Sequence, residues 1–256
     1  MALLEVSHLH KRFGGLHAVN DVSFAVQPGQ IKAVIGPNGA GKTTLFNCIA
    51  GTFPPSEGRV HFGGQSIEGL EPHRIASRGM SRTFQNIKLY PGLTALENVM
   101  IGRHCRSRAG FWAGMLRLPS TFREEREIRE RSLEFLELLG VADLAGSEAT
   151  SLAFGQQRAV EFARALAAEP TLLLLDEPAA GLNIYETAEV ARLISTIRDR
   201  GITVLLVEHD MSLVMDISDE IVVLSFGQKI AEDTPHNIQQ NREVIRIYLG
   251  EDDAAD

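Results

Sequence analysis

The chain has 256 residues, of which 44% are hydrophobic and 23% charged, a composition that indicates a soluble globular protein and excludes disorder throughout. Its formal net charge of −8 argues against a protein whose main task is to grip a nucleic-acid backbone. Cys48 and Cys105 have no metal-ligand spacing, and we expect Cys48 to be a buried free thiol. The N-terminus lacks the layout of a secretory signal, and no apolar run approaches the ~20 residues that span a bilayer. Any membrane role is therefore expected to come through a partner.

The sequence pattern of the first part of the chain predicts strands. Residues 21–26 are followed by a Pro28-Gly29 turn and by the apolar run Ile31–Ile35. A helical pattern begins near Lys42, and another strand is predicted over Arg59–Phe62. A short strand is then expected to lead through residues 81–84 to the next loop.

In the middle of the chain, residues 87–168, the sequence pattern predicts helices. Thr94-x-x-Glu97 has the pattern of a capping box and is expected to open a helix that ends near Arg103. Thr121-x-x-Glu124 has the same pattern, and Gly140 is expected to end that second helix. This part therefore predicts a helical subdomain inserted into another fold.

Alternating strands and helices return after residue 168. The runs Leu172–Leu175, Thr203–Val207 and Ile221–Leu224 are continuously apolar, as is typical of parallel strands buried on both faces. A helical pattern separates the first two runs and is expected to end at Gly201. The pattern predicts an α/β core.

A phosphate-binding motif follows the predicted strand Ile31–Ile35. The sequence G-P-N-G-A-G-K-T-T fits the pattern G-x-x-x-x-G-K-T, in which backbone N–H groups and a helix N-terminus surround a phosphate cluster. Lys42 is expected to reach the β- and γ-phosphates, and the Thr43 hydroxyl to ligate Mg²⁺. The candidate nucleotide-binding residues are Gly36, Pro37, Asn38, Gly39, Ala40, Gly41, Lys42, Thr43 and Thr44.

Two acidic residues follow the predicted strand Leu172–Leu175. Asp176, at the end of a buried strand, can hold a metal ion beside the phosphates, and Glu177 can polarise a water for attack on the γ-phosphate. An acidic pair after a strand is often only a solvated loop. Its combination with an upstream phosphate loop favours the catalytic interpretation.

This order of elements resembles the ATP-binding subunits of ABC transporters over essentially the whole chain. The resemblance implies that Gln85 touches Mg²⁺ and the attacking water, and that His209 contacts the γ-phosphate. Residues 179–183 resemble the loop that crosses the dimer interface. Phe13 aligns with the aromatic residue that stacks on adenine, although a single aromatic residue can also belong to the core.

The sequence S-L-A-F-G-Q-Q at residues 151–157 stands where the family has its signature, usually L-S-G-G-Q. Ala153 replaces the serine and Phe154 the first glycine, so no hydroxyl is available for the γ-phosphate. Gly155 precedes a helical pattern and predicts a second anion site, which in the family serves the nucleotide of the opposite subunit. Ala153, Gly155 and Gln156 are therefore candidate contacts to that nucleotide, and catalysis is expected to survive because Glu177 and His209 are present.

The signature variant resembles that of the large ATPase subunit of branched-chain amino acid importers. Further similar stretches are Arg12–Leu16, Arg82–Gln85, Gly110–Arg123, Asp176–Asn183, Glu208–Met211 and Val244–Glu251. The ATPase of lipopolysaccharide export has a similar ending, but it is expected to keep the signature serine. The apolar stretch 110–118 with Trp112 is expected to pack inside the helical subdomain rather than to receive a coupling helix.

Together these patterns predict a phosphate-loop α/β core with N-terminal antiparallel strands. The core is expected to comprise residues 1–86 and 169–256, and the helical subdomain residues 87–168. The resemblance implies Mg²⁺-dependent ATP hydrolysis in a head-to-tail dimer with itself or a homologue. It also implies transmembrane permease subunits, an extracellular substrate-binding protein and a place at the cytoplasmic face of the membrane. The alternatives are a non-transport ABC ATPase acting on DNA or ribosomes and a nucleotide sensor without turnover.

Overall fold

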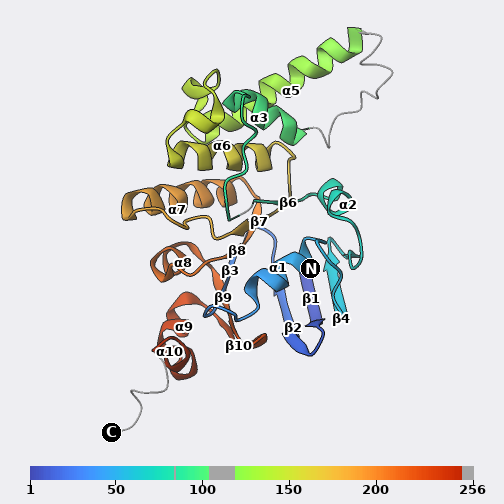
Figure 1. Cartoon of the computed structure of the whole chain (residues 1–256), viewed down its shortest axis with the longest axis vertical. Helices are drawn as coiled ribbons and strands as arrows, with labels where there is room; N and C mark the ends of the chain where they lie inside the picture. The colour runs from blue at the N-terminus through green and yellow to red at the C-terminus, as the bar shows by residue number, and fades with distance from the viewer. Residues whose placement is uncertain (84, 104–118, 250–256) are drawn as a thin grey trace.

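The computed structural model describes residues 1–83, 85–103 and 119–249. A six-stranded sheet in the order β10-β9-β3-β8-β7-β6 lies at its centre (Figure 1). The strands from β9 to β6 are parallel, and β10 pairs antiparallel with β9 at the edge. Their bounds are β3 (Ile31–Ile35), β6 (Met80–Arg82), β7 (Leu172–Asp176), β8 (Thr203–Val207), β9 (Glu220–Ser225) and β10 (Gln228–Asp233).

A second, antiparallel sheet packs beside the first one. Its order is β2-β1-β4-β5, with β1 (Leu4–Phe13), β2 (Leu16–Val26), β4 (Glu57–Phe62) and β5 (Gln65–Ser66). The two-residue turn between β1 and β2 contains Gly14 in the left-handed region, as tight hairpins require. The antiparallel strands predicted near the N-terminus are therefore confirmed.

The helices fall into groups around the two sheets (Figure 1). The helices α3 (Ala95–Gly102), α5 (Pro119–Leu138) and α6 (Phe154–Leu166) lie together at one end of the molecule. The short 3₁₀ turns Ala142–Leu144 and Ala149–Ser151 connect the last two of these helices. The remaining helices are α1 (Lys42–Ile49), α2 (Pro72–Ser77), α7 (Ile184–Asp199), α8 (Met211–Ile217), α9 (Pro235–Gln240) and α10 (Arg242–Leu249).

The core has two parts, one on each face of the six-stranded sheet. Along β8, Val204 and Leu206 pack with the side chains of α6 and α7, whereas Leu205 and Val207 pack with α1 and the antiparallel sheet. All five residues of β3, of β7 and of β8 are buried. This explains why these strands are continuously apolar and do not alternate. Cys48 lies in the second part of the core as a buried free thiol, as expected.

Of two predicted helix starts, the structure confirms one and moves the other. The Thr94–Glu97 capping box at α3 is confirmed, because the Thr94 hydroxyl accepts from the Glu97 N–H at 3.2 Å and the Glu97 carboxylate accepts from the Thr94 N–H at 2.8 Å. The expected start at Thr121 is wrong, because α5 begins at Pro119 and its first turn already contains Thr121. Proline is favoured at a helix start, since its fixed φ fits the helix and it has no N–H to satisfy there.

Several elements near the C-terminus were not anticipated: β10, α8, α9 and α10. They are short, and β10 is a half-buried edge strand without an apolar run. Val244 of α10 is buried against the sheet and so attaches this segment to the core. Within the described residues, no helix has both the length and the apolar composition to cross a lipid bilayer.

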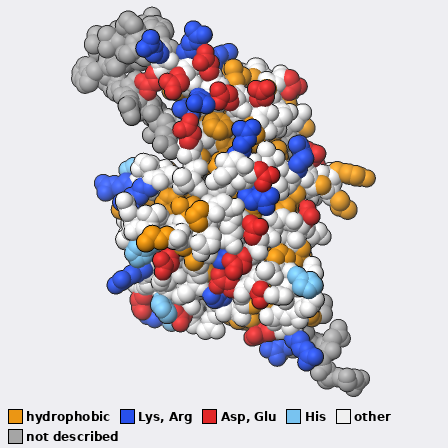
Figure 2. Space-filling model, turned by 180° about the vertical axis from the view of Figure 1, so that it is seen from behind, with side chains coloured by type: hydrophobic (Ala, Val, Ile, Leu, Met, Phe, Trp, Pro, Cys, Tyr) orange, Lys and Arg blue, Asp and Glu red, His pale blue; other side chains and the backbone are white. Residues whose placement is uncertain are grey.

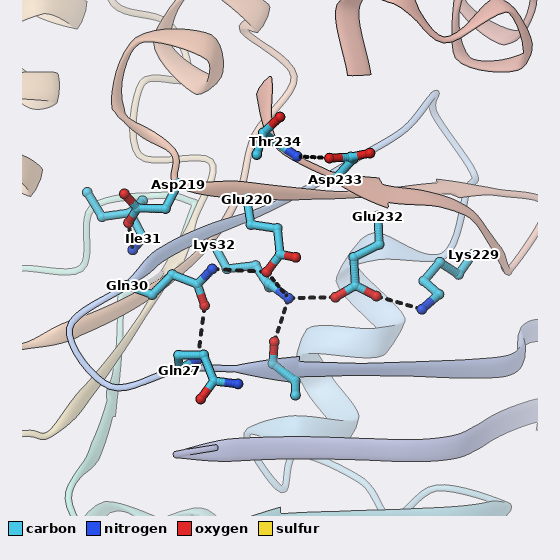
Figure 3. Close-up of polar contacts among 11 residues, drawn as sticks. Gln27, Gln30, Ile31, Lys32, Asp219, Glu220, Lys229, Glu232, Asp233 and Thr234 are labelled. Atoms are coloured by element: carbon cyan, nitrogen blue, oxygen red, sulfur yellow. Dashed lines mark hydrogen bonds and ion pairs between the residues drawn. The ribbon is translucent and has the colours of Figure 1, made fainter. Parts of the chain in front are cut away.

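A buried lysine near the start of β3 joins the two sheets (Figure 3). Lys32 is 1% exposed, and its ammonium lies 2.8 Å from the Glu220 carboxylate and 2.6 Å from that of Glu232. It also donates to the Ala25 carbonyl oxygen of β2 at 2.5 Å. Because an ammonium has three protons, this arrangement satisfies all of them and links β3, β9 and β10 to β2.

Candidate functional site

The phosphate loop leaves the carboxyl end of β3, and its glycines are required by close backbone contacts. A Cβ on Gly41, where φ is 96°, would lie 2.3 Å from the Ala18 carbonyl oxygen, and one on Gly36 would lie 2.2 Å from that of Leu224. The loop is also held by the β9–β10 turn, since the Gly227 N–H donates to the Ala40 carbonyl at 3.0 Å. Only the glycine pattern allows a loop this close to its neighbours.

Lys42 lies inside the loop that it follows. Its ammonium donates to the carbonyl oxygens of Gly36 at 2.6 Å and of Pro37 at 3.1 Å, and the residue is 7% exposed. Burial lowers the pKa of Lys42, while the negative charges of Glu177 and Glu208 oppose this shift. The structure therefore places the predicted phosphate-binding cation at the loop and near the predicted base. Thr43, by contrast, is exposed.

The Asp176 carboxylate is buried at the carboxyl end of β7. It forms an ion pair with Arg82, a contact that the sequence analysis did not predict. The Arg82 guanidinium of the neighbouring strand β6 lies 2.7 Å from the Asp176 carboxylate. Arg82 also donates to the Asn47 side-chain oxygen of α1 at 2.7 Å. It thus connects the strand carrying Asp176 to the helix that begins at the phosphate loop.

The predicted metal ligands are oxygen donors, which suits Mg²⁺. Thr43 supplies a hydroxyl, Asp176 a carboxylate and Gln85 an amide oxygen. No group of three or more His, Cys, Asp or Glu side chains able to hold a metal ion occurs among the described residues. Such a donor set fits a metal held by one carboxylate together with substrate phosphates, rather than one enclosed by the protein.

Three residues predicted to act in hydrolysis meet at one carboxylate. The Gln85 side-chain amide donates to the Glu177 carboxylate at 2.7 Å, and the His209 Nδ1 lies 3.9 Å from the same oxygen. Glu177 adopts a left-handed backbone conformation with φ at 47°, which is uncommon for a residue other than glycine. The sequence predicted the roles of these residues, and the structure shows that they lie together.

The signature segment lies on the helical part of the chain, away from α1 (Figure 1). The helix α6 begins at Phe154, two residues before the expected start at Gln156, and Ala153 is its N-cap residue. The Ala153 side chain makes no capping hydrogen bond, and the Gln156 side-chain oxygen accepts from the Ala153 N–H at 3.2 Å. Ala153 and Phe154 are exposed, and Gly155 has open space where a Cβ would stand. The N-terminus of α6 is thus accessible from outside the chain.

A fully buried arginine connects α6 to the loop of Gln85. Arg158 is 0% exposed and its guanidinium lies 2.7 Å from the Glu161 carboxylate. It also donates to the Gln85 carbonyl oxygen at 3.2 Å. The main chain of Gln85 is therefore held by the helical part, while its side chain is held by Glu177 of the core.

Phe13 lies at the end of β1 and is 48% exposed, so it does not belong to the core. Its ring packs edge-to-face against Phe53, with ring centroids 5.6 Å apart, and the Lys11 ammonium lies 5.2 Å from its centroid. A half-exposed ring in this position remains available for a stacking partner. Phe84, the stretch around Trp112 and the ending Gly250–Glu251 lie outside the described residues.

Comparisons with known proteins identify the family of the chain. A family model described as ABC transporter matches residues 19–180, and one described as branched-chain amino acid ATP-binding cassette transporter matches residues 228–254. The chain is 47% identical over 250 residues to the high-affinity branched-chain amino acid transport ATP-binding protein BraF of Pseudomonas aeruginosa. It is 45% identical over 250 residues to LivG of Escherichia coli, which has the same description. Each alignment covers 97% of this chain and 98% of the relative.

Solved structures lead to the same family. The crystal structure of the ADP conformation of an ABC transporter ATP-binding cassette matches with a TM-score of 0.85 and 33% identity, over 98% of this chain and 99% of the other. A dimeric bacterial ABC transporter cassette matches with a TM-score of 0.75 and 26% identity, over 91% and 98%. The phosphate-loop α/β fold predicted from the sequence is therefore confirmed. The chain belongs to the ABC transporter family, as one of its ATP-hydrolysing subunits.

Proposed function

We propose that this subunit powers the import of branched-chain or related amino acids through a membrane transporter. The observation that carries the proposal is the similarity to BraF over nearly the whole of both chains. The match of residues 228–254 to the branched-chain amino acid model adds support, because β10, α9 and α10 all fall in this range. The subunit would lie at the cytoplasmic face of the membrane, and an extracellular binding protein would deliver the amino acid to the permease.

In the proposed reaction, the side chains around Glu177 act on the water that attacks the γ-phosphate. The Glu177 carboxylate orients this water and accepts its proton, Gln85 fixes the water from the other side, and His209 donates to the γ-phosphate. Their meeting at one carboxylate oxygen supports this assignment. Thr43, Asp176 and Gln85 would hold Mg²⁺, which supplies charge neutralisation at the phosphates.

The adenine and phosphates would be held by separate parts of the chain. Phe13 would stack on adenine, whereas residues 36–44 would surround the phosphates with N–H groups and the Lys42 ammonium. Since the N-terminus of α6 is exposed and lies away from α1, the signature residues Ala153, Gly155 and Gln156 would reach the nucleotide of a second ATPase subunit. The likeness to a dimeric cassette supports a closed pair with two nucleotides between its members.

The permease would dock in a groove between the core and the proposed helical subdomain, residues 87–168. This groove has a volume of about 640 Å³ and lies beside the loop of Gln85. Its apolar lining includes Ile75, Met80, Ile101, Ala165, Ala168 and Leu174. Such a lining suits the apolar face of a helix. On the face drawn in Figure 2, basic and acidic side chains are interspersed, and its described residues form no continuous basic surface for nucleic acid.

The proposal can be tested by transport in proteoliposomes that contain the chain with its co-expressed permease. Uptake of radiolabelled leucine should require ATP and the binding protein, and should exceed uptake of an acidic or basic amino acid at least tenfold. The Glu177→Gln variant should lose steady-state turnover while it accumulates as an ATP-bound dimer in light scattering. Glu189→Gln, which removes an exposed carboxylate of α7, is the matched control and should behave as the parent. ATP turnover without amino acid uptake would contradict the import assignment.

A further inference from the structure

Glu208 is a buried carboxylate without an assigned role. It follows β8 directly, immediately before His209, and it is 0% exposed. Burying a carboxylate is costly unless hydrogen bonds satisfy its oxygens. The partners that make this burial possible lie on two different loops.

Each oxygen of Glu208 serves one loop. One oxygen accepts from the Ala179 N–H at 2.9 Å, in the segment that follows Glu177. The other accepts from the N–H of His209 at 2.7 Å and from that of Asp210 at 3.2 Å. The same carboxylate thus holds the start of the 179–183 loop and the backbone that carries the His209 side chain.

Each of the two loops has a role in the proposed mechanism, one toward the second subunit and one toward the nucleotide. Residues 179–183 lead from Glu177 to the N-cap of α7 at Asn183 and would face the second subunit. His209 would face the γ-phosphate of the nucleotide bound in its own subunit. A fixed connection between them would allow subunit closure to set the position of the histidine.

We propose that Glu208 is a positioning residue that ties these two loops together, so that dimer closure and the placement of His209 occur as one event. This inference rests on the proposed function, because it assumes hydrolysis in a closed dimer. It assigns Glu208 no contact with ATP. Its effect on turnover would pass through the backbone of the two loops and through the His209 ring, whose Nδ1 lies 3.4 Å from the Glu208 oxygen that also accepts from the His209 N–H.

Glutamine is the informative replacement at this position. It keeps the shape of the side chain but has one acceptor oxygen, and its NH₂ group cannot accept from an N–H. Glu208→Gln can therefore hold one loop but not both. Glu232→Gln is the matched control, since it removes a carboxylate that pairs with Lys32 and lies on β10, which carries neither loop (Figure 3).

The experiment measures kcat and KM for ATP, together with ATP-dependent dimerisation and thermal unfolding, for the parent and both variants. We expect Glu208→Gln to lower kcat about 10- to 100-fold, as small misplacements of catalytic groups do, with KM within about twofold. Its ATP-dependent dimer should also weaken. Glu232→Gln should lower Tm without changing kcat.

Different outcomes test the proposed function and the proposed role of Glu208. A parent complex that does not hydrolyse ATP would refute the proposed function. An active parent with an unchanged kcat in Glu208→Gln would overturn only the role of Glu208, as would an equal loss of kcat in Glu232→Gln at equal Tm. If Glu208→Gln does not fold, amide hydrogen exchange in the parent decides. The N–H groups of Ala179 and His209 should show similar protection, and a difference above about tenfold would overturn the proposal.

Discussion

At the scale of single residues, Lys32 stabilises the fold because its ammonium neutralises two carboxylates, those of Glu220 and Glu232. Replacing it by methionine removes the ammonium between Glu220 and Glu232 and leaves the Ala25 carbonyl oxygen without this donor. Glu232 keeps its ion pair with Lys229, and Glu220 keeps its hydrogen bond from Gln30. We expect Lys32→Met to lower the free energy of unfolding by about 3 kcal/mol, as for other broken buried ion pairs. Urea denaturation measures this value. A loss below 1 kcal/mol would show that water replaces the ammonium without cost.

The same cluster makes stability depend on pH. Burial opposes ionisation of Glu220, but hydrogen bonds from Lys32 and Gln30 outweigh it and lower the pKa below 4.5. The unfolded chain therefore binds the proton more tightly, so this stabilisation is present above pH 4.5 and is lost as the pH falls through the lower folded value. In Glu220→Gln, that part of the acid-dependent loss of stability should be absent.

The site residues that were not foreseen share one property. Arg82, Arg158 and Glu208 are charged residues, and each makes at least one contact with a group that is remote in sequence. Motif spacing predicts which side chains touch phosphate or water, because that chemistry fixes their types. It does not show which side chains hold the motifs together, because this depends on which strands and loops become neighbours.

At the scale of elements, α6 begins without a side-chain cap because residue 153 is alanine. Serine is among the favoured N-cap residues, and its oxygen would accept an N–H of the first turn. We expect Ala153→Ser to raise the free energy of unfolding by about 1 kcal/mol, and to change turnover by less than about threefold. Denaturation and ATPase assays measure the two effects. A large gain in turnover would mean that the parent site is limited by the missing hydroxyl.

The sequence predicted long, strongly apolar or capped elements well and short ones poorly. The strands β3, β7 and β8 and the capped helix α3 stand where expected. The start of α5 was misplaced because the Thr121–Glu124 pattern also occurs inside its first turns. β10 was missed because a half-buried edge strand needs no regular apolar alternation.

At the scale of the whole molecule, docking on the permease can be separated from ATP chemistry. Ile101 of α3 lines the groove and is 37% exposed, and Ile245 of α10 has a similar exposure of 41% outside the groove lining. We expect Ile101→Glu to abolish co-purification with the permease while the isolated chain keeps its ATPase rate. Ile245→Glu should leave both unchanged. Loss of binding in both variants would place the docking surface elsewhere.

The order of the six-stranded sheet has a consequence for synthesis on the ribosome. The strand that carries the phosphate loop, β3, pairs only with β8 and β9, which come much later in the chain. A nascent chain therefore displays the complete phosphate-loop sequence long before its hydrogen-bonding neighbours exist. Because such long-range pairing cannot form early, the ability to bind ATP should arise late in translation. A chain truncated before Glu220 is expected to keep the motif and yet bind no nucleotide.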